Sequence, residues 1–181
     1  MLTLEELGIV SENAHITALS TPYDNPLIAF QKFLAKAAAQ GACLRTIIYS
    51  DTLPQYFQGI EAAKKAGCDV KVLFDHTQAE GKFEKEQIAA LDAAGFKDGT
   101  DFLIGTSPDH REILHQKQTT IWAPGLTPTT LLGSWNFSYS ASKEVNNFVL
   151  IESAALAAQQ KKLFDALWAF IQANEQEYQT Q

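Results

Sequence analysis

The chain has 181 residues, of which 46% are apolar and 19% charged, and this composition excludes a disordered or fibrous protein. The net charge of -7 disfavours a broad basic face for nucleic acid, and no apolar run reaches the roughly 18 residues of a membrane-spanning helix. The length predicts one domain over residues 1–181. A cytoplasmic location is predicted because no signal peptide is visible, although a chain trimmed of its signal would look the same.

The first half of the chain repeats a strand followed by a helix. Three segments rich in branched apolar residues predict strands, at 14–20, 43–50 and 69–75. Apolar residues at helical spacing follow each of them and predict helices over 27–40, from a cap at Asp51 or Thr52 to 66, and over 82–94. This alternation predicts an α/β fold with a mixed, mostly parallel sheet and helices on both faces.

From residue 101 the rhythm changes to strand-like segments separated by turns. These segments are DFLIGT (101–106), EILHQKQTTIW (112–122), TTLLGSW (129–135) and NNFVLIE (146–152). The prolines of APGLTP (123–128) predict a stiff exposed loop, which we interpret as a substrate-contacting lip. A final amphipathic helix over 154–176 is expected to cover the core with Leu156, Leu163, Leu167 and Phe170.

Two short motifs suggest a phosphate site. His115 and Lys117 are two apart on an alternating run, so on one strand they would point to the same side, at a spacing that suits a phosphate. In GSWN, Gly133 allows a tight bend, and Ser134 and Asn136 can present a hydroxyl and an amide to an anion. Either motif alone is ordinary surface or turn chemistry, and only their combination indicates function.

The order of HxK, a hairpin, GSxN, and then an acid and asparagine entering a strand (KEVNNFVLI, 143–151) resembles the phospholipase D superfamily of HKD type. The resemblance covers residues 115–151, and the preceding strand–helix repeats fit that family's fold. It implies phosphodiester hydrolysis without a metal or cofactor: one histidine attacks phosphorus to form a phosphohistidine, and a second histidine protonates the leaving oxygen. In this chain His115 matches the histidine, Lys117 the lysine that holds the phosphoryl oxygens, and Asn136 with Ser134 the other phosphate contacts.

The chain contains each motif once, as in the small single-motif nucleases of this superfamily. An active enzyme is therefore expected to be a homodimer whose two His115 side chains face each other across the two-fold axis. The first hypothesis is an endonuclease on DNA or RNA. The alternatives are a phosphodiesterase acting on a phospholipid such as cardiolipin and a phosphate-binding or scaffolding domain without turnover. The sequence leaves open whether transfer goes to water or another alcohol, and whether the chain is part of a longer two-motif protein.

The chain departs from the family pattern at two acids. The usual motif is HxKxxxxD, and its last position is Trp122 in this sequence. The acid that orients the catalytic histidine normally precedes the asparagine of the last strand, where this chain has Asn146. Glu144, two residues earlier, is our candidate for that role.

The remaining residues of interest have structural interpretations. His76 and His110 are interpreted as loop histidines, with His110 as an alternative cleft residue, and His15 is expected to begin a strand. Trp135 is expected to point away from its neighbours Ser134 and Asn136 and to pack in the core. The two cysteines, Cys43 and Cys68, are predicted to be structural thiols rather than a disulfide or metal site.

Overall fold

The computed structural model describes residues 13–38, 41–109 and 112–174, so His110 lies outside the described residues. Seven strands form one sheet in the order β1-β7-β6-β5-β2-β3-β4. The strands are β1 (His15–Thr21), β2 (Cys43–Ile48), β3 (Asp69–Asp75), β4 (Phe102–Gly105), β5 (Gln118–Trp122), β6 (Thr129–Gly133) and β7 (Asn146–Glu152). The helices are α1 (Pro26–Leu34), the short 3-10 helix η1 (Ala35–Ala38), α2 (Pro54–Lys65), α3 (His76–Ala79), α4 (Lys82–Ala93) and α5 (Ala154–Ala173).

The α/β class is confirmed, but the prediction of a mostly parallel sheet is wrong. Only the β2–β3 and β3–β4 pairs are parallel, whereas β1–β7, β7–β6, β6–β5 and β5–β2 are antiparallel. The strand–helix rhythm holds for β2 to β4, where crossover helices keep the strands parallel. It fails elsewhere because short turns join β5 to β6, and because β1 pairs with the distant β7 instead of its neighbour in sequence.

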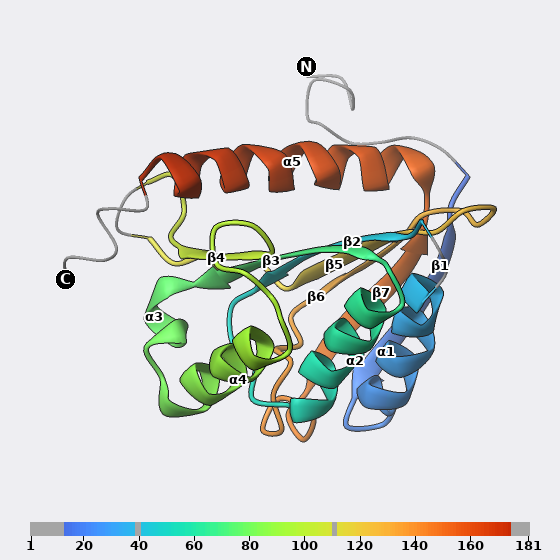
Figure 1. Cartoon of the computed structure of the whole chain (residues 1–181). Helices are drawn as coiled ribbons and strands as arrows, with labels where there is room; N and C mark the ends of the chain where they lie inside the picture. Colours follow the sequence, from blue (N-terminus) through green and yellow to red (C-terminus); the bar gives the residue numbers. More distant parts are fainter. Residues whose placement is uncertain (1–12, 39–40, 110–111, 175–181) are drawn as a thin grey trace, which may run out of the picture.

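Helices cover both faces of the sheet, as predicted (Figure 1). The larger core lies on the face of α1 and α2, where Phe30, Tyr56 and Phe137 stack. The smaller core lies under α5 and contains the buried residues Phe164, Leu167, Trp168 and Ile171. Burying this apolar area drives folding at about 25 cal/mol per Å².

The α5 helix buries a different stripe from the one expected. Leu167 is buried and Phe170 packs against the smaller core, but Leu163 is 39% exposed. The buried positions are spaced by three, four and seven residues through Ala157, Phe164, Trp168 and Ile171, and this spacing turns Leu163 toward solvent. No described helix is both long and apolar enough to cross a bilayer.

Several local predictions are confirmed and others are corrected. His15 begins β1, Trp135 is 1% exposed and packs on Phe137 and Phe148, and both cysteines are free. The α2 helix has Leu53 as its N-cap rather than Asp51 or Thr52, because Pro54 fixes the first helical position. Asp51 contributes indirectly by accepting the Leu53 backbone N–H at 2.8 Å.

Candidate active site

The strand registers gather the motif residues at one edge of the sheet. Ile48 pairs with Phe74 at the carboxyl ends of β2 and β3, and Gln118 at the start of β5 pairs with Ile47 and with Leu132 near the end of β6. Gly133 at the end of β6 pairs with Phe148 near the start of β7. The residues that extend these strand ends therefore lie at the same end of the sheet: Tyr49, Asp75, Lys117, Ser134 and Asn146.

His115 and Lys117 lie just before β5 rather than on it. The predicted strand over 112–122 is shorter, because β5 begins only at Gln118. His115 is exposed, whereas Lys117 is 5% exposed and its Nζ donates to the His115 carbonyl oxygen at 2.8 Å. The prediction that His115 and Lys117 lie on one strand is therefore wrong. The hydrogen bond from Lys117 to the His115 backbone still keeps the two residues together.

Tyr49 at the end of β2 contacts both residues. Its ring centroid lies 4.3 Å from that of His115 in an edge-on arrangement, and the Lys117 ammonium lies 4.5 Å from its centre. The Tyr49 hydroxyl accepts a hydrogen bond from Gln78 Nε2 at 3.2 Å. An aromatic face favours a cation, so Tyr49 fixes the position of the ammonium without neutralising its charge.

The electrostatics favour a neutral imidazole beside a cation. Partial burial and the neighbouring Lys117 ammonium lower the pKa of His115 below its usual value, and the Asp75 charge opposes this shift. Burial also lowers the pKa of Lys117 to about 8, again against Asp75. At neutral pH His115 is therefore free to act as a nucleophile while Lys117 remains charged.

Asp75, like Tyr49, is a residue of this candidate site that the sequence analysis missed. It ends β3, is 0% exposed, and its Oδ2 accepts the Leu114 backbone N–H at 2.5 Å. Its Oδ1 accepts both the N–H and the hydroxyl of Thr77 and the N–H of Gln78. Asp75 thus holds the backbone next to His115 and caps α3. The sequence signal that could have identified Asp75 was an aspartate at the end of a buried strand, directly before residues that begin a helix.

His76 is also placed differently from the prediction. It is the first residue of the short helix α3, whose N-cap is Asp75, and not part of a loop. Its place directly after β3 puts it at the same end of the sheet as His115.

Ser134 joins β6 to the start of β7 at the same edge. Its hydroxyl lies 3.2 Å from both Asn146 Oδ1 and Asn147 Oδ1 and accepts the Asn147 N–H at 3.1 Å. A Cβ on Gly133 would lie 2.3 Å from the Asn147 carbonyl oxygen, so glycine is needed here for close backbone approach. GSxN is therefore a tight junction between two strands.

Asn136 is half-buried in the loop after β6. Its side-chain Oδ1 is buried and has no hydrogen-bond partner among the described residues. The loop is anchored at the next residue, where the Phe137 carbonyl oxygen accepts the N–H groups of Thr52 and Leu53. This anchor holds Asn136 at the end of β6 with unused hydrogen-bonding capacity.

Glu144 lies in the exposed turn before β7. Its carbonyl oxygen accepts the Thr21 hydroxyl at 2.6 Å, so its backbone ties the turn to β1. The negative charge of Asp75 acts on His115 and opposes the lowering of its pKa. At the position of the usual orienting acid, Asn146 donates to the Ala141 carbonyl oxygen at 3.0 Å.

Trp122 and the loop over 123–128 lie at the other end of the sheet. Trp122 pairs with Cys43, the first residue of β2, and lies about 16 Å along the strand from Lys117 at ~3.3 Å per residue. The loop follows Trp122 and leads into Thr129, the far end of β6. Our interpretation of this loop as a lip over the site is therefore wrong, and the missing aspartate is remote from His115.

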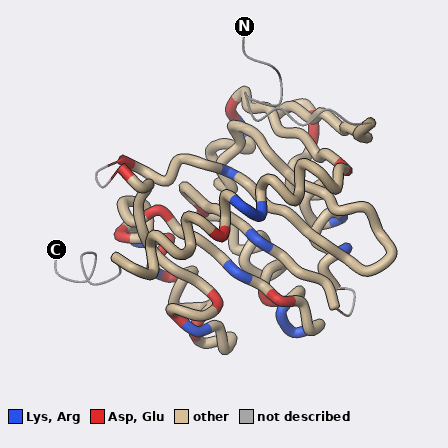
Figure 2. The backbone as a smooth tube through the Cα atoms, turned by 90° about the horizontal axis from the view of Figure 1, so that it is seen from above, with Lys and Arg blue, Asp and Glu red and all other residues tan. Residues whose placement is uncertain are grey.

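Charged residues of both signs are distributed along the chain. Figure 2 shows lysine and arginine residues scattered among aspartate and glutamate residues.

Within 13–38, 41–109 and 112–174, no three histidine, cysteine or acidic side chains are grouped so that they could hold a metal ion. At the end of the sheet that holds His115, the positive charge that is buried is the Lys117 ammonium.

A comparison with protein families matches residues 32–168 to the model described as cardiolipin synthase, PLD-like domain, where PLD stands for phospholipase D. The chain belongs to the phospholipase D-like family. This match confirms the resemblance to the phospholipase D superfamily, and its range spans the positions of His115, Lys117, Ser134 and Asn136. No curated protein matches the chain in sequence.

Solved structures show the same fold. Nuc from Salmonella typhimurium, a phospholipase D family member, is 22% identical, with a TM-score of 0.69 over 87% of this chain and 95% of Nuc. NucT from Helicobacter pylori is 16% identical, with a TM-score of 0.65 over 85% of this chain and 95% of NucT. Polyphosphate kinase from Porphyromonas gingivalis is 16% identical, with a TM-score of 0.60 over 84% of this chain but 26% of the kinase.

Proposed function

We propose that this phospholipase D-like protein is a metal-independent phosphodiesterase that acts through a phosphohistidine at His115. A neutral ring nitrogen of His115 attacks phosphorus, and the bond to the leaving oxygen breaks as a second histidine protonates that oxygen. Water then attacks the phosphohistidine, gives its proton to the second histidine, and releases His115 and a phosphate monoester. The observation that carries the proposal is the Lys117 ammonium held beside the His115 backbone and on Tyr49.

Lys117 can supply the electrostatic part of this reaction. The phosphoryl transition state carries negative charge on its equatorial oxygens, and a pre-positioned ammonium stabilises it more than the ground state. Because Lys117 is already fixed by its own chain, it needs little reorganisation when substrate binds. Ser134 and Asn136 at the neighbouring strand end are proposed as further phosphate contacts.

Asp75 is proposed to position His115 in place of Glu144, which was our candidate from the sequence. Its carboxylate fixes the Leu114 N–H, one residue before the histidine, and its charge acts on the imidazole. This arrangement controls the backbone and the electrostatic field around His115.

The second histidine is proposed to come from a second copy of the chain. Large apolar side chains are exposed in the segments that lie near this end of the sheet: Tyr23 at 90%, Ile113 at 38%, Tyr139 at 65% and Val145 at 86%. Exposed apolar side chains at one end of the molecule can be buried by association. In the proposed homodimer they would surround two facing His115 side chains.

An endonuclease acting on DNA or RNA is the proposed activity, because the chain has the fold of Nuc over nearly the whole length of Nuc. The test is cleavage of single- and double-stranded DNA and RNA in the presence of EDTA. His115→Ala is expected to abolish cleavage, whereas His15→Ala, an exposed histidine at the other end of the sheet, should leave it unchanged. Cleavage that survives His115→Ala would disprove the proposed nucleophile.

Two observations favour other functions. The description of the matched family model names cardiolipin synthase. Liposomes that contain cardiolipin or phosphatidylglycerol are therefore the second substrate to test. Asn146 at the usual acid position favours a phosphate-binding domain without turnover. Denaturing a reaction with labelled substrate at alkaline pH, where the phosphorus–nitrogen bond survives, traps any phosphohistidine and separates the enzyme from the binding domain, because only the enzyme forms that bond.

A further inference from the structure

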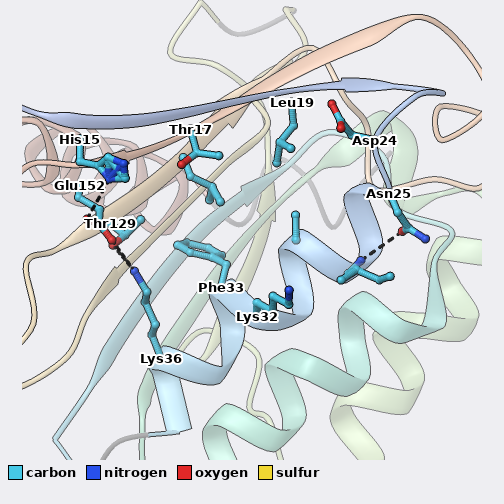
Figure 3. A pocket seen from close by; sticks show the side chains of 13 residues that line it. His15, Thr17, Leu19, Asp24, Asn25, Lys32, Phe33, Lys36, Thr129 and Glu152 are labelled. Atoms are coloured by element: carbon cyan, nitrogen blue, oxygen red, sulfur yellow. Dashed lines mark hydrogen bonds and ion pairs between the residues drawn. The ribbon is translucent and has the colours of Figure 1, made fainter.

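The cavity between β1 and α1 has charges of both signs, and these charges balance (Figure 3). Two lysines and two carboxylates line it: Lys32, Lys36, Asp24 and Glu152. The cavity therefore selects no charged ligand. By contrast, the carboxyl group of Asp51 is buried at the end of the sheet that holds the candidate active site, and no cation among the described residues pairs with it.

Asp51 is fully buried, and its side chain uses only half of its hydrogen-bonding capacity. Its Oδ1 accepts the Leu53 backbone N–H at 2.8 Å, whereas its Oδ2 is buried and has no partner among the described residues. Burial raises the pKa of Asp51 well above its usual value, the charge of Glu84 raises it further, and the hydrogen bond from Leu53 opposes this shift. Because a buried polar atom without a partner costs free energy, Asp51 needs a reason other than packing.

Asp51 lies where two strands that are not neighbours in the sheet come together. The strand β5 separates β2 from β6 and begins at Gln118. Beyond that residue, the segments that continue β2 and β6 join directly through a parallel bridge between Asp51 and Phe137. The Phe137 carbonyl oxygen accepts the N–H groups of Thr52 at 3.0 Å and Leu53 at 3.2 Å. The bridge therefore spans the start of β5, next to the candidate active site.

The Asp51 side chain shapes the turn that makes this bridge. By accepting the N–H of Leu53, two residues ahead, it closes the kind of turn that aspartate side chains form with their own backbone. This turn directs the N–H groups of Thr52 and Leu53 toward Phe137, whose ring is buried in the larger core. Phe137 is thus fixed by its backbone and its side chain, and Asn136, directly before it, is fixed as well.

We propose that Asp51 is a positioning residue: its carboxyl group holds the turn that fixes Phe137, and this places Asn136 for contact with a phosphate oxygen. The role rests on the proposed function, because Asn136 is a phosphate contact only if the site binds phosphate. It gives Asp51 no contact with the substrate. A neutral acceptor is sufficient for this role, so asparagine should replace Asp51.

The test is the affinity of the full chain for tungstate, measured by calorimetric titration at pH 7. Asp51→Ala and Asn136→Ala are each expected to weaken tungstate binding about tenfold, because each removes the same contact with a charged group. In the double variant the loss should stay about tenfold, because Asp51 acts through Asn136. Asp51→Asn keeps the acceptor for the Leu53 N–H and should bind within about twofold of the parent protein.

Two further variants separate positioning from stability. Asp51→Val keeps most of the buried volume without the acceptor and should show the same loss as Asp51→Ala, so the test does not depend on one variant remaining folded. Ser153→Ala is the matched control, because Ser153 is a buried N-cap at the far end of β7 that accepts the Leu156 N–H at 3.0 Å. It should lower the unfolding temperature and leave tungstate affinity unchanged.

Amide hydrogen exchange tests the geometry without a ligand. Protection of the Thr52 and Leu53 amides should be lost in Asp51→Ala and Asp51→Val and kept in Asp51→Asn and Ser153→Ala. Protection that survives in Asp51→Val would refute the role of the carboxyl group.

Lys117→Met separates the role of Asp51 from the proposed function. If Lys117→Met loses tungstate while Asp51→Ala binds it as the parent does, the phosphate site stands and the role of Asp51 is refuted. Additive losses in the double variant, unchanged affinity in Asn136→Ala, or equal losses in Asp51→Asn and Asp51→Ala would refute it as well. If the parent protein binds no tungstate, the proposed function fails, and the role of Asp51 fails with it.

Discussion

The groups that lie toward β3 and the groups that lie toward β7 from the His115–Lys117 pair differ in charge. Toward β3 lies the buried Asp75, whose two oxygens accept four hydrogen bonds and whose charge acts on both residues. Toward β7 lie the neutral amides of Asn146 and Asn147, which are bonded to Ser134. Among the described contacts, the carboxylate that supports the pair is that of Asp75, so catalysis should depend far more on the β3 side.

After the removal of His115, the replacement of Lys117 should lower the rate of cleavage most. Lys117→Met keeps the aliphatic volume and removes the charge, so cleavage is expected to fall by about 10²–10³-fold. Lys143→Met, an exposed lysine in the turn before β7, is the matched control and should change the rate less than twofold. Equal losses in the two variants would show a diffuse charge effect instead of a specific contact.

Asp75→Asn tests the β3 side directly. The amide would direct a donor toward one of the four N–H and O–H groups now bonded to Asp75, so cleavage should fall by about 10–100-fold through misplacement of His115. Glu144→Gln is the comparison and should have almost no effect on the rate. Thermal unfolding of both variants separates loss of position from loss of fold, and a larger effect in Glu144→Gln would reverse our assignment of the two acids.

Asn146→Glu should add a carboxylate on the β7 side of His115 and so improve the orientation of the imidazole. A carboxylate at the usual position of the orienting acid can accept a charge-assisted hydrogen bond, and we expect a gain in rate of about three- to tenfold. The gain should disappear in the Asn146→Glu, His115→Ala double variant. If Asn146→Glu is instead slower than the parent, the β7 side does not orient the histidine in this chain.

The pKa of about 8 for Lys117 predicts how anion binding depends on pH. Lys117 loses its proton as the pH rises through this value, so the affinity for tungstate, whose charge is constant here, should fall about tenfold from pH 7 to pH 9. In Lys117→Arg this fall should vanish, and in Asp75→Asn its midpoint should move to lower pH because the opposing negative charge is gone. Affinity that is flat across this range in the parent protein would contradict the role of Lys117.

The smallest effect is expected at Trp122, where the family motif has aspartate. Because this residue lies at the far end of β5, Trp122→Asp should change the rate of cleavage less than twofold. The Trp122 indole is half-buried, and Trp122→Asp removes this buried apolar area. The free energy of unfolding should therefore fall by about 1–3 kcal/mol, measured by urea titration.

The sequence predicted most elements and the family, because periodicity and the HxK and GSxN motifs are local signals. It did not predict the sheet order, since the pairing of β1 with β7 joins residues more than a hundred positions apart. The sequence predicted His115 and Lys117 as site residues because they belong to one local motif, and their role in the site stays a prediction. Asp75 and Tyr49 were missed as site residues because they come from separate strands and meet the motif only in three dimensions.

The pairing of β5 with β2 on one side and β6 on the other has a consequence for assembly of the protein. Tyr49 and Asp75 are made early in the chain, His115 and Lys117 later, and the partners of Ser134 later still. No contiguous fragment ending before β7 would hold all of these groups in place. If the proposed activity is correct, turnover would report completion of the whole sheet, and refolding could be followed by the return of cleavage instead of by spectroscopy.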